Sequence, residues 1–265
     1  MTALSNHHAS SIVKLMFIGD SGTGKTGAHV SLIEAGYKLR FLDMDNGLDS
    51  LIAFARKQCP DLIDNVDYET RRDKYKATKM GPIIAGLPSA FTDAMRLMTK
   101  WSDDTDPAEW GEGTIFVLDS LDSLGRSAFE WAKGMNAIAT KPNPDPRNWF
   151  YVAQRAVEDV ISLLSGESFR TNVIIVSHIT MVENEDGSRK GYPSAIGTAL
   201  SRNLGKYFNT MLLAETSGSG DNVRRTIKTV PTMTIDLKNP KPFTIDGTLP
   251  LSTGLATVFE KLKET

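Results

Sequence analysis

The sequence contains a single cysteine, Cys59, so no disulfide bond can form within the chain. Low cysteine content is typical of a reducing compartment, and we expect the protein to act in the cytoplasm. No apolar run approaches the roughly 18 residues that a membrane-spanning helix requires, so we expect no membrane partner. The 30 basic and 32 acidic side chains nearly cancel, leaving a formal net charge of −2. Any binding of nucleic acid must therefore come from local charged loops, not from a global positive field.

Apolar segments of strand length alternate along the chain with amphipathic segments of helix length. The expected strands are Ile12–Ile18, Lys38–Asp43, Thr114–Asp119, Asn172–Ser177 and Phe208–Ala214. The expected helices are Lys25–Glu34, Leu48–Lys57, Ser89–Lys100, Leu121–Lys133, Trp149–Ser165 and Ala195–Leu204. This alternation predicts an α/β fold with a mainly parallel, twisted sheet that helices cover on both faces.

The C-terminal part of the chain has a different pattern. Thr226–Val230, Thr232–Leu237 and Phe243–Ile245 predict antiparallel strands, and Thr257–Lys263 favours a closing helix. No segment has the composition of an interdomain linker. We therefore expect a flexible leader over residues 1–11 and one domain over residues 12–265.

A glycine-rich octet follows the first expected strand directly. It consists of Gly19, Asp20, Ser21, Gly22, Thr23, Gly24, Lys25 and Thr26. The glycines allow successive backbone N–H groups to turn inward around a polyphosphate, and the start of the next helix favours the same anion. Lys25 adds a cation for the β- and γ-phosphates, and the Thr26 hydroxyl is a ligand for Mg²⁺. The alternative is a glycine turn that binds nothing, but the octet between a strand and a helix predicts a site for a nucleoside triphosphate.

A second carboxylate is needed to hold Mg²⁺, and Asp119 supplies a candidate. It ends the apolar run that begins at Ile115, at the carboxyl end of an expected strand. Doubly wound sheets bind their ligands at that edge. The alternative is that Asp119 caps the helix expected to begin near Leu121. Given the phosphate loop upstream, we favour the metal role.

Hydrolysis also requires a group that orients and deprotonates water. Asp45 lies just past the expected strand Lys38–Asp43, where a carboxylate can face the γ-phosphate. The alternative is that Asp43, Asp45 and Asp49 are only turn and cap residues. His178 follows another expected strand at the same edge. It is either an ordinary histidine, at the surface or satisfied in the core, or a contact to the γ-phosphate that reports its loss.

Together these segments resemble the motifs of the RecA-like recombinase ATPases, and within them the compact phage RecA-core proteins of the Sak single-strand annealing type. The resemblance covers nearly the whole chain. It implies an ATPase that uses Mg²⁺, with Asp45 at the position of the family's water-activating acid, usually Glu. Ser177 and His178 fall where RecA has Asn-Gln, the pair that couples the γ-phosphate to the DNA-binding loops. It also implies a homo-oligomer, either a ring or a filament, and a location in the host cytoplasm if a phage encodes the protein.

The same resemblance implies single-stranded DNA as a partner, with a single-strand-binding protein as a possible helper. The two family DNA-binding loops correspond to Gly134–Asn148 and Glu183–Tyr192. Their candidate DNA contacts are Lys133, Lys141, Arg147, Arg189, Lys190 and Tyr192, with plain solvated loops as the alternative. Lys238 and Lys241 resemble a lysine pair that reaches the γ-phosphate of a neighbouring subunit in RecA filaments.

Three functions follow from these observations. The first is an ATP-hydrolysing protein that acts on single-stranded DNA in recombination or annealing, with turnover stimulated by DNA. The second is a nucleotide-gated loader or assembly scaffold with slow turnover and no direct DNA role, because Asp45 is one methylene shorter than Glu. The third is a small-molecule phosphotransferase, since phosphate loops also serve kinases. That class usually carries an arginine-bearing lid, and the segment most open to such a role, Gly134–Asn148, has only Arg147.

Overall fold

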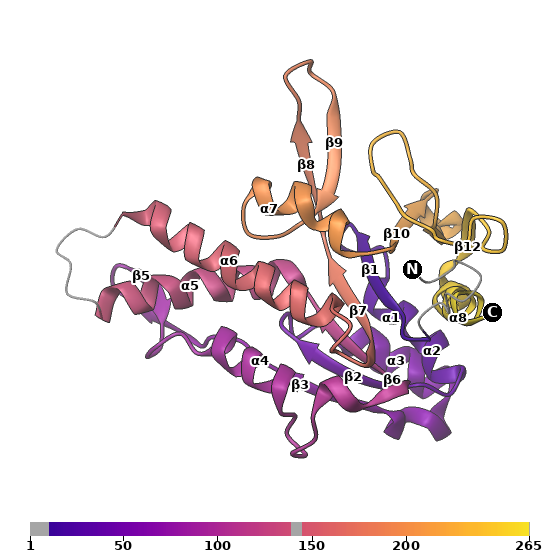
Figure 1. Cartoon of the computed structure of the whole chain (residues 1–265), viewed down its shortest axis with the longest axis horizontal. Helices are drawn as coiled ribbons and strands as arrows, with labels where there is room; N and C mark the ends of the chain where they lie inside the picture. Colours follow the sequence, from indigo (N-terminus) through magenta and orange to yellow (C-terminus); the bar gives the residue numbers. More distant parts are fainter. Residues whose placement is uncertain (1–10, 139–144, 265) are drawn as a thin grey trace, which may run out of the picture.

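The computed structural model of the chain describes residues 11–138 and 145–264, and it is built around one large sheet (Figure 1). The eight strands lie in the order β12-β11-β10-β1-β7-β6-β2-β3. Six strands run parallel: β1 (Lys14–Gly19), β2 (Lys38–Asp43), β3 (Val66–Thr70), β6 (Gly111–Asp119), β7 (Thr171–Ser177) and β10 (Thr210–Ser217). The antiparallel strands β11 (Arg224–Lys228) and β12 (Thr248–Pro250) extend one edge. The predicted α/β fold, with a mainly parallel sheet and C-terminal antiparallel strands, is confirmed.

Helices cover both faces of this sheet. One face packs against α1 (Lys25–Ala28), α2 (Val30–Glu34), α3 (Asp49–Gln58) and α8 (Leu251–Lys263). The other packs against α4 (Ala90–Thr99), α5 (Leu121–Ile138), α6 (Pro146–Ser165) and α7 (Thr198–Asn203). Side chains alternate between the two faces along a strand, so Leu15 and Phe17 of β1 enter one core while Met16 and Ile18 enter the other. Burial on both faces explains why the central strands are continuous apolar runs.

Two hairpins and four short 3₁₀ turns complete the described chain. The hairpins are formed by β4 (Tyr75–Thr78) with β5 (Gly81–Ile84), and by β8 (Ile179–Glu183) with β9 (Arg189–Pro193). The 3₁₀ turns are η2 (Pro60–Asn65), η3 (Pro107–Glu109), η4 (Leu204–Tyr207) and η5 (Gly220–Asn222). The β8–β9 hairpin projects from the sheet just beyond β7, whereas β5 lies well away from it in the same view (Figure 1).

Both segments expected to be DNA-binding loops contain regular structure within the described residues. Of the first, 134–148, residues 139–144 lie outside the described residues; α5 continues to Ile138 and α6 begins at Pro146, where the Asp145 carboxylate accepts a hydrogen bond from the Arg147 backbone N–H at 2.9 Å. Proline suits the first turn of a helix, since its missing N–H is not needed there. The second, 183–192, is largely the β8–β9 hairpin, closed by a turn with Gly187 at φ 80°. The expected leader lies almost entirely outside the described residues, which begin at Ser11.

The C-terminal strands were predicted only in part. The strand expected at 226–230 is β11, but 232–237 and 243–245 form no ladder, and Ile235 makes only an isolated bridge to Gly191. Pro231, Pro240 and Pro242 lack the N–H groups that a ladder needs. The sheet is completed instead by β12, and the last helix begins at Leu251, earlier than expected.

Candidate nucleotide-binding and hydrolysis site

The loop between β1 and α1 is curved, and the side chain of Lys25 lies inside the curve. The Lys25 ammonium donates hydrogen bonds to the carbonyl oxygens of Gly19, at 2.7 Å, and Asp20, at 3.0 Å. Gly22 and Gly24 adopt left-handed backbone conformations, with φ of 80° and 92°, which only glycine adopts without strain. Burial lowers the pKa of Lys25, and the charges of nearby carboxylates, Asp119 first among them, oppose that shift. A buried cation inside a curved loop is suited to accept the phosphates of a nucleotide.

Thr26 and Asp119 meet at the carboxyl edge of the sheet, although 93 positions separate them in the sequence. The Thr26 hydroxyl donates a hydrogen bond to Oδ2 of Asp119 at 2.8 Å. Asp119 ends β6, between β2 and β7, and the peptide bond that follows it is cis. Burial raises the pKa of the Asp119 carboxyl to about 6, against the opposing hydrogen bond from Thr26.

These two side chains fit a magnesium ion. A hydroxyl and a carboxylate oxygen are hard ligands of the kind that Mg²⁺ prefers, and the Asp119 carboxylate is buried beside the Thr26 hydroxyl. Among residues 11–138 and 145–264, no group of three or more His, Cys, Asp or Glu side chains is arranged to hold a metal by itself. Mg²⁺ is commonly held by one or two protein ligands together with substrate phosphates, so this sparse donor set suits it.

Asp43 and Asp45 have different surroundings, as the sequence suggested. Asp43 is buried, and its Oδ1 accepts hydrogen bonds from the backbone N–H groups of Asp45, Asn46 and Gly47 at 3.1, 2.8 and 3.3 Å. It holds the turn after β2 in shape. The carboxylate of Asp45 lies at the rim, where it accepts hydrogen bonds from the hydroxyls of Ser120, at 2.7 Å, and Ser123. Asp45 is therefore the acid of this pair that faces the cavity, with both oxygens held by serine hydroxyls.

His178 stands directly after β7 and is paired with an acid that the sequence did not single out. Its Nδ1 lies 3.1 and 3.0 Å from the two carboxylate oxygens of Asp122, in the first turn of α5. The hydrogen bond to Asp122 raises the pKa of His178 above its usual range, and partial burial opposes the shift. The sequence does contain a signal for Asp122, which is the spacing Asp119-x-x-Asp122. A residue three positions after a strand-terminal acid returns to the same rim of the sheet.

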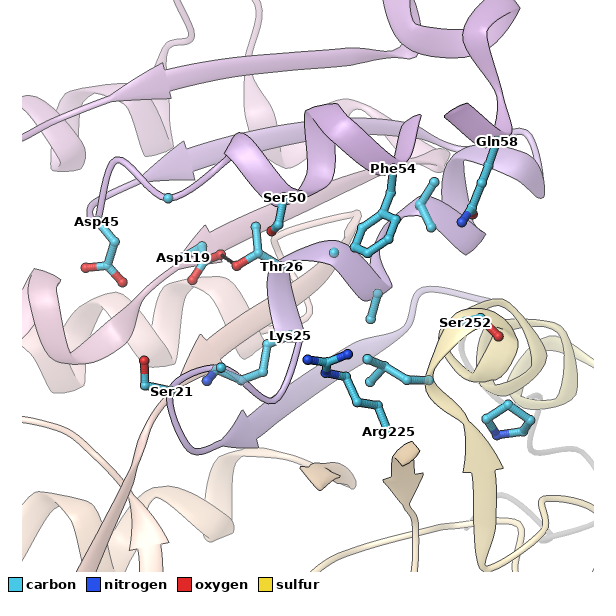
Figure 2. A pocket seen from close by; sticks show the side chains of 18 of the residues that line it. Ser21, Lys25, Thr26, Asp45, Ser50, Phe54, Gln58, Asp119, Arg225 and Ser252 are labelled. Atoms are coloured by element: carbon cyan, nitrogen blue, oxygen red, sulfur yellow. Dashed lines mark hydrogen bonds between the residues drawn. The ribbon is translucent and has the colours of Figure 1, made fainter. Parts of the chain in front are cut away.

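A cavity of about 600 Å³ joins these groups to a second set of side chains. Figure 2 shows Asp45, Asp119 and Thr26 toward one end, and Phe54 and Gln58 of α3 toward the other. Ser50, Phe54 and Gln58 recur at intervals of four, so they share one face of α3. Across from them lie Arg225 of β11, Pro250 at the end of β12, and Leu251 and Ser252 at the start of α8. Sequence reasoning missed this end of the site.

The phosphate loop packs tightly against these new walls. A Cβ atom added to Gly24 would lie 2.7 Å from Cδ2 of Leu251, and one added to Gly27 would lie 2.8 Å from Cε2 of Phe54. A side chain at either glycine would require the Leu251 or the Phe54 side chain to shift. The C-terminal helix and α3 therefore form, with the phosphate loop, one continuous pocket.

The candidate DNA contacts lie apart from this cavity, and most already have partners. Arg147 pairs with Asp145 at 2.8 Å, Arg189 with Glu183 at 3.6 Å, and Lys190 with Asp236 at 2.5 Å. Lys133 is within 3.5 Å of Glu130, and Tyr192 is partly buried in β9. Lys141 lies outside the described residues.

The two lysines expected to reach a neighbouring subunit also make contacts within the chain. The ammonium of Lys238 donates to the carbonyl oxygen of Gly205 at 2.6 Å, and that of Lys241 donates to the carbonyl oxygen of Glu264. Neither lysine lines the nucleotide cavity. A trans-subunit role would require both side chains to leave these partners.

Comparison with known proteins places these features in a wider group. A family model described as "AAA domain" matches residues 12–240. The crystal structure of the RadB recombinase aligns with a TM-score of 0.50 at 13% identity, over 95% of this chain and 92% of that one. The flagellar accessory protein FlaH from Methanocaldococcus jannaschii gives 0.43 at 8% identity, over 91% and 84%. A KaiC-like protein from Pyrococcus horikoshii OT3 gives 0.40 at 10% identity, over 82% and 77%.

A comparison with curated protein sequences found no match. At 13% identity, the likeness to the RadB structure shows a shared RecA-like fold and nothing finer. Across the part of the chain that the structure describes, none of the helices combines the length and apolar character needed to cross a lipid bilayer.

Proposed function

We propose that this chain, which belongs to the AAA domain family, binds and hydrolyses ATP with Mg²⁺, and that it acts on single-stranded DNA in recombination or annealing. The observation that carries the nucleotide part is the 2.8 Å hydrogen bond between Thr26 and Asp119. It brings a phosphate-loop hydroxyl and a strand-terminal carboxylate into one place, as a phosphate-bound Mg²⁺ requires.

Each residue of the site has a separate role in this proposal. Lys25 leaves the carbonyl oxygens of Gly19 and Asp20 and binds the β- and γ-phosphates. Thr26 and Asp119 hold Mg²⁺, which neutralises phosphate charge when it is bound. Asp45 orients a water molecule for in-line attack and accepts its proton. His178, held by Asp122, contacts the γ-phosphate and registers its departure.

The nucleoside end of ATP lies against α3 in this proposal. Phe54 offers an aromatic face, and Arg225 extends toward the cavity between Lys25 and the start of α8 (Figure 2). Among the described residues, no carboxylate lies within ion-pair distance of Arg225, so its charge is available to the ligand. An aromatic ring and a planar guanidinium are both suited to stack on a base.

The DNA part has different support. The resemblance to the phage Sak type implies it, and the fold is shared with the RadB recombinase. The β8–β9 hairpin carries Arg189, Lys190 and Tyr192, and it follows His178 directly in the chain. Single-stranded DNA bound to this hairpin is therefore connected through the backbone to the residue that contacts the γ-phosphate. A homo-oligomer in the cytoplasm, with a single-strand-binding protein as helper, belongs to the same proposal.

The experiment that tests the proposal is ATP turnover with and without single-stranded DNA. We expect phosphate release that depends on Mg²⁺ and rises when an oligonucleotide is added. Turnover that is unchanged by DNA, together with no DNA binding at low salt, would remove the DNA part. A failure of Mg²⁺·ATP to bind would remove the whole proposal.

One observation favours a second candidate, a nucleotide-gated loader or scaffold with slow turnover. Both carboxylate oxygens of Asp45 accept hydrogen bonds from serine hydroxyls, and its side chain is shorter than that of Glu. The substitution Asp45→Asn separates the two functions. A scaffold keeps its activity in this variant, whereas a cycling ATPase loses it.

A further inference from the structure

The segment from Arg71 to Lys79 is the part of the chain where positive charge gathers most closely. It holds five cations against one carboxylate, Asp73, in a chain whose formal net charge is −2. It forms the root and first strand of the β4–β5 hairpin. None of the functional roles assigned above uses it.

The carboxylates nearest to these cations already have partners. Oδ1 of Asp73 accepts hydrogen bonds from the backbone N–H groups of Ser89 and Ala90, at 2.8 and 3.1 Å, and so caps α4. Glu69 pairs with Arg71 at 2.5 Å. Within the described ranges no carboxylate is in ion-pair contact with the three lysines of the hairpin, which are Lys74, Lys76 and Lys79. The positive charge of these three lysines is therefore available to a binding partner.

The hairpin also exposes large side chains on both faces. All four residues of β4 are exposed, Tyr75 is 59% exposed and Ile83 is 48% exposed. Strand alternation places Lys74 and Lys76 on one face and Tyr75 on the other. Spaced cations on the face of Lys74 and Lys76 fit the phosphates of a single strand of nucleic acid. Tyr75, on the opposite face, offers a ring on which a base stacks where the strand passes round the edge of the two-stranded hairpin.

The root of the hairpin is bonded to the turn that carries Asp45. Oγ1 of Thr70 donates to the carboxylate of Asp43 at 3.0 Å, and the backbone N–H of Arg71 donates to the Asp43 carbonyl at 2.9 Å. The Arg72 guanidinium then donates to the backbone carbonyl of Asp45 at 3.4 Å. Three hydrogen bonds therefore link the root of the hairpin to the turn that carries Asp45.

We propose that the β4–β5 hairpin is a binding site for single-stranded DNA, separate from the β8–β9 hairpin, and that Arg72 couples its occupancy to the position of Asp45. This inference rests on the DNA part of the proposed function. It adds a contact surface on the β3 side of the sheet, away from β8 and β9 (Figure 1).

The binding site is tested with the triple variant Lys74→Gln, Lys76→Gln, Lys79→Gln, and a labelled oligonucleotide in fluorescence anisotropy. The matched control is Lys38→Gln, Lys57→Gln, Lys100→Gln, which removes the same charge near the amino ends of the parallel strands. We expect the hairpin variant to bind at least tenfold more weakly at low salt. We also expect the slope of log affinity against log salt to fall by about 2, because each phosphate contact contributes roughly 0.7 on single strands.

The outcomes separate this inference from the function on which it rests. If the wild type binds DNA and the hairpin variant binds as well as the control, the hairpin site is wrong while the DNA function stands. If the wild type binds no DNA at low salt, both are wrong. Tyr75→Ser should weaken binding about fivefold, a loss of one stacked base. A polyaspartate peptide that competes as well as the oligonucleotide would also overturn the site, because charge alone would then explain it.

The coupling is tested separately with Arg72→Gln. We expect this variant to bind the oligonucleotide within about threefold of the wild type, since it loses at most one of several phosphate contacts. At saturating DNA, its ATP turnover should no longer respond to the oligonucleotide. A response equal to that of the wild type would overturn the coupling, as would a wild-type turnover that DNA leaves unchanged.

Discussion

The Thr26 hydroxyl and the Asp119 carboxylate lie 2.8 Å apart, joined by a hydrogen bond across the carboxyl edge of the sheet. One side chain comes from the last residue of the phosphate loop, in the first turn of α1, and the other from the end of β6. Neither residue makes a metal site alone. Their contact turns two separate sequence motifs into one pair of ligands, and the first prediction concerns that pair.

Substitution Thr26→Ala should lower ATP turnover about 100-fold and raise the Mg²⁺ concentration needed for half-maximal rate, because a direct metal ligand is lost. Thr26→Ser keeps the hydroxyl and should retain most of the rate. The measurement is phosphate release during a Mg²⁺ titration. Equal rates and equal Mg²⁺ dependence in the Ala and Ser variants would contradict a ligand role for Thr26.

Substitution Lys25→Met should abolish the stabilisation that ATP gives to the folded protein. A ligand at 100 times its Kd adds about 2.7 kcal/mol to the unfolding free energy, which a melting curve detects readily. Without nucleotide, the variant should be at least as stable as the wild type, since burial disfavours the Lys25 charge. A variant that ATP still stabilises fully would show that Lys25 is not a phosphate contact.

Substitution Asp45→Asn should leave ATP binding intact and reduce turnover by about 10²- to 10⁴-fold, the usual contribution of a general base. Ser123→Ala is the companion variant, because it frees one oxygen of Asp45 without removing the carboxylate. Single-turnover hydrolysis separates chemistry from binding. A rate in the Asn variant close to that of the wild type would assign the base elsewhere.

The pair formed by His178 and Asp122 should be visible by NMR. With Asp122 present, the imidazole should titrate above its usual pKa of about 6.5, and Asp122→Asn should bring it down. A histidine with a raised pKa stabilises the fold when protonated. That contribution is complete below about pH 6.5 and is lost as the pH rises through the folded-state value. A titration curve unchanged by Asp122→Asn would show that the pair does not form in solution.

His29 should make the protein sensitive to acid. It is fully buried between Phe17 and Phe41, its Nε2 has no partner in the described structure, and burial lowers its pKa to about 4. Unfolding then takes up a proton between about pH 6.5 and pH 4. The contribution of His29 to the free energy of unfolding falls by about 3 kcal/mol as the pH is lowered across that window. Urea unfolding at several pH values should show this loss in the wild type and its absence in His29→Leu.

The parts predicted correctly from the sequence are those with strong local patterns. Continuous apolar runs such as Val173–Val176 predict strands buried on both faces, and the glycine spacing before Lys25 predicts the phosphate loop. The position of Asp45 beyond the end of β2 could also be predicted from the sequence, because parallel sheets bind their ligands at the carboxyl ends of the strands.

The missed features depend on contacts between distant segments. Nothing near Arg225 or Leu251 in the sequence indicates that they line the nucleotide cavity; only the antiparallel addition of β11 and β12 brings them there. The expected strand 232–237 failed because prolines on both sides prevent a ladder. The partnership of His178 with Asp122 required the relative placement of β7 and α5, which hydrophobic periodicity does not specify.

The close approach of Leu251 to Gly24 has a consequence for how the protein is made. One wall of the pocket around the phosphate loop, at Leu251, is translated more than two hundred residues after the loop itself. A nascent chain therefore has no complete pocket around this loop until synthesis has passed Leu251. A ligand that needs the whole pocket can stabilise only chains synthesised beyond that point and cannot assist earlier intermediates.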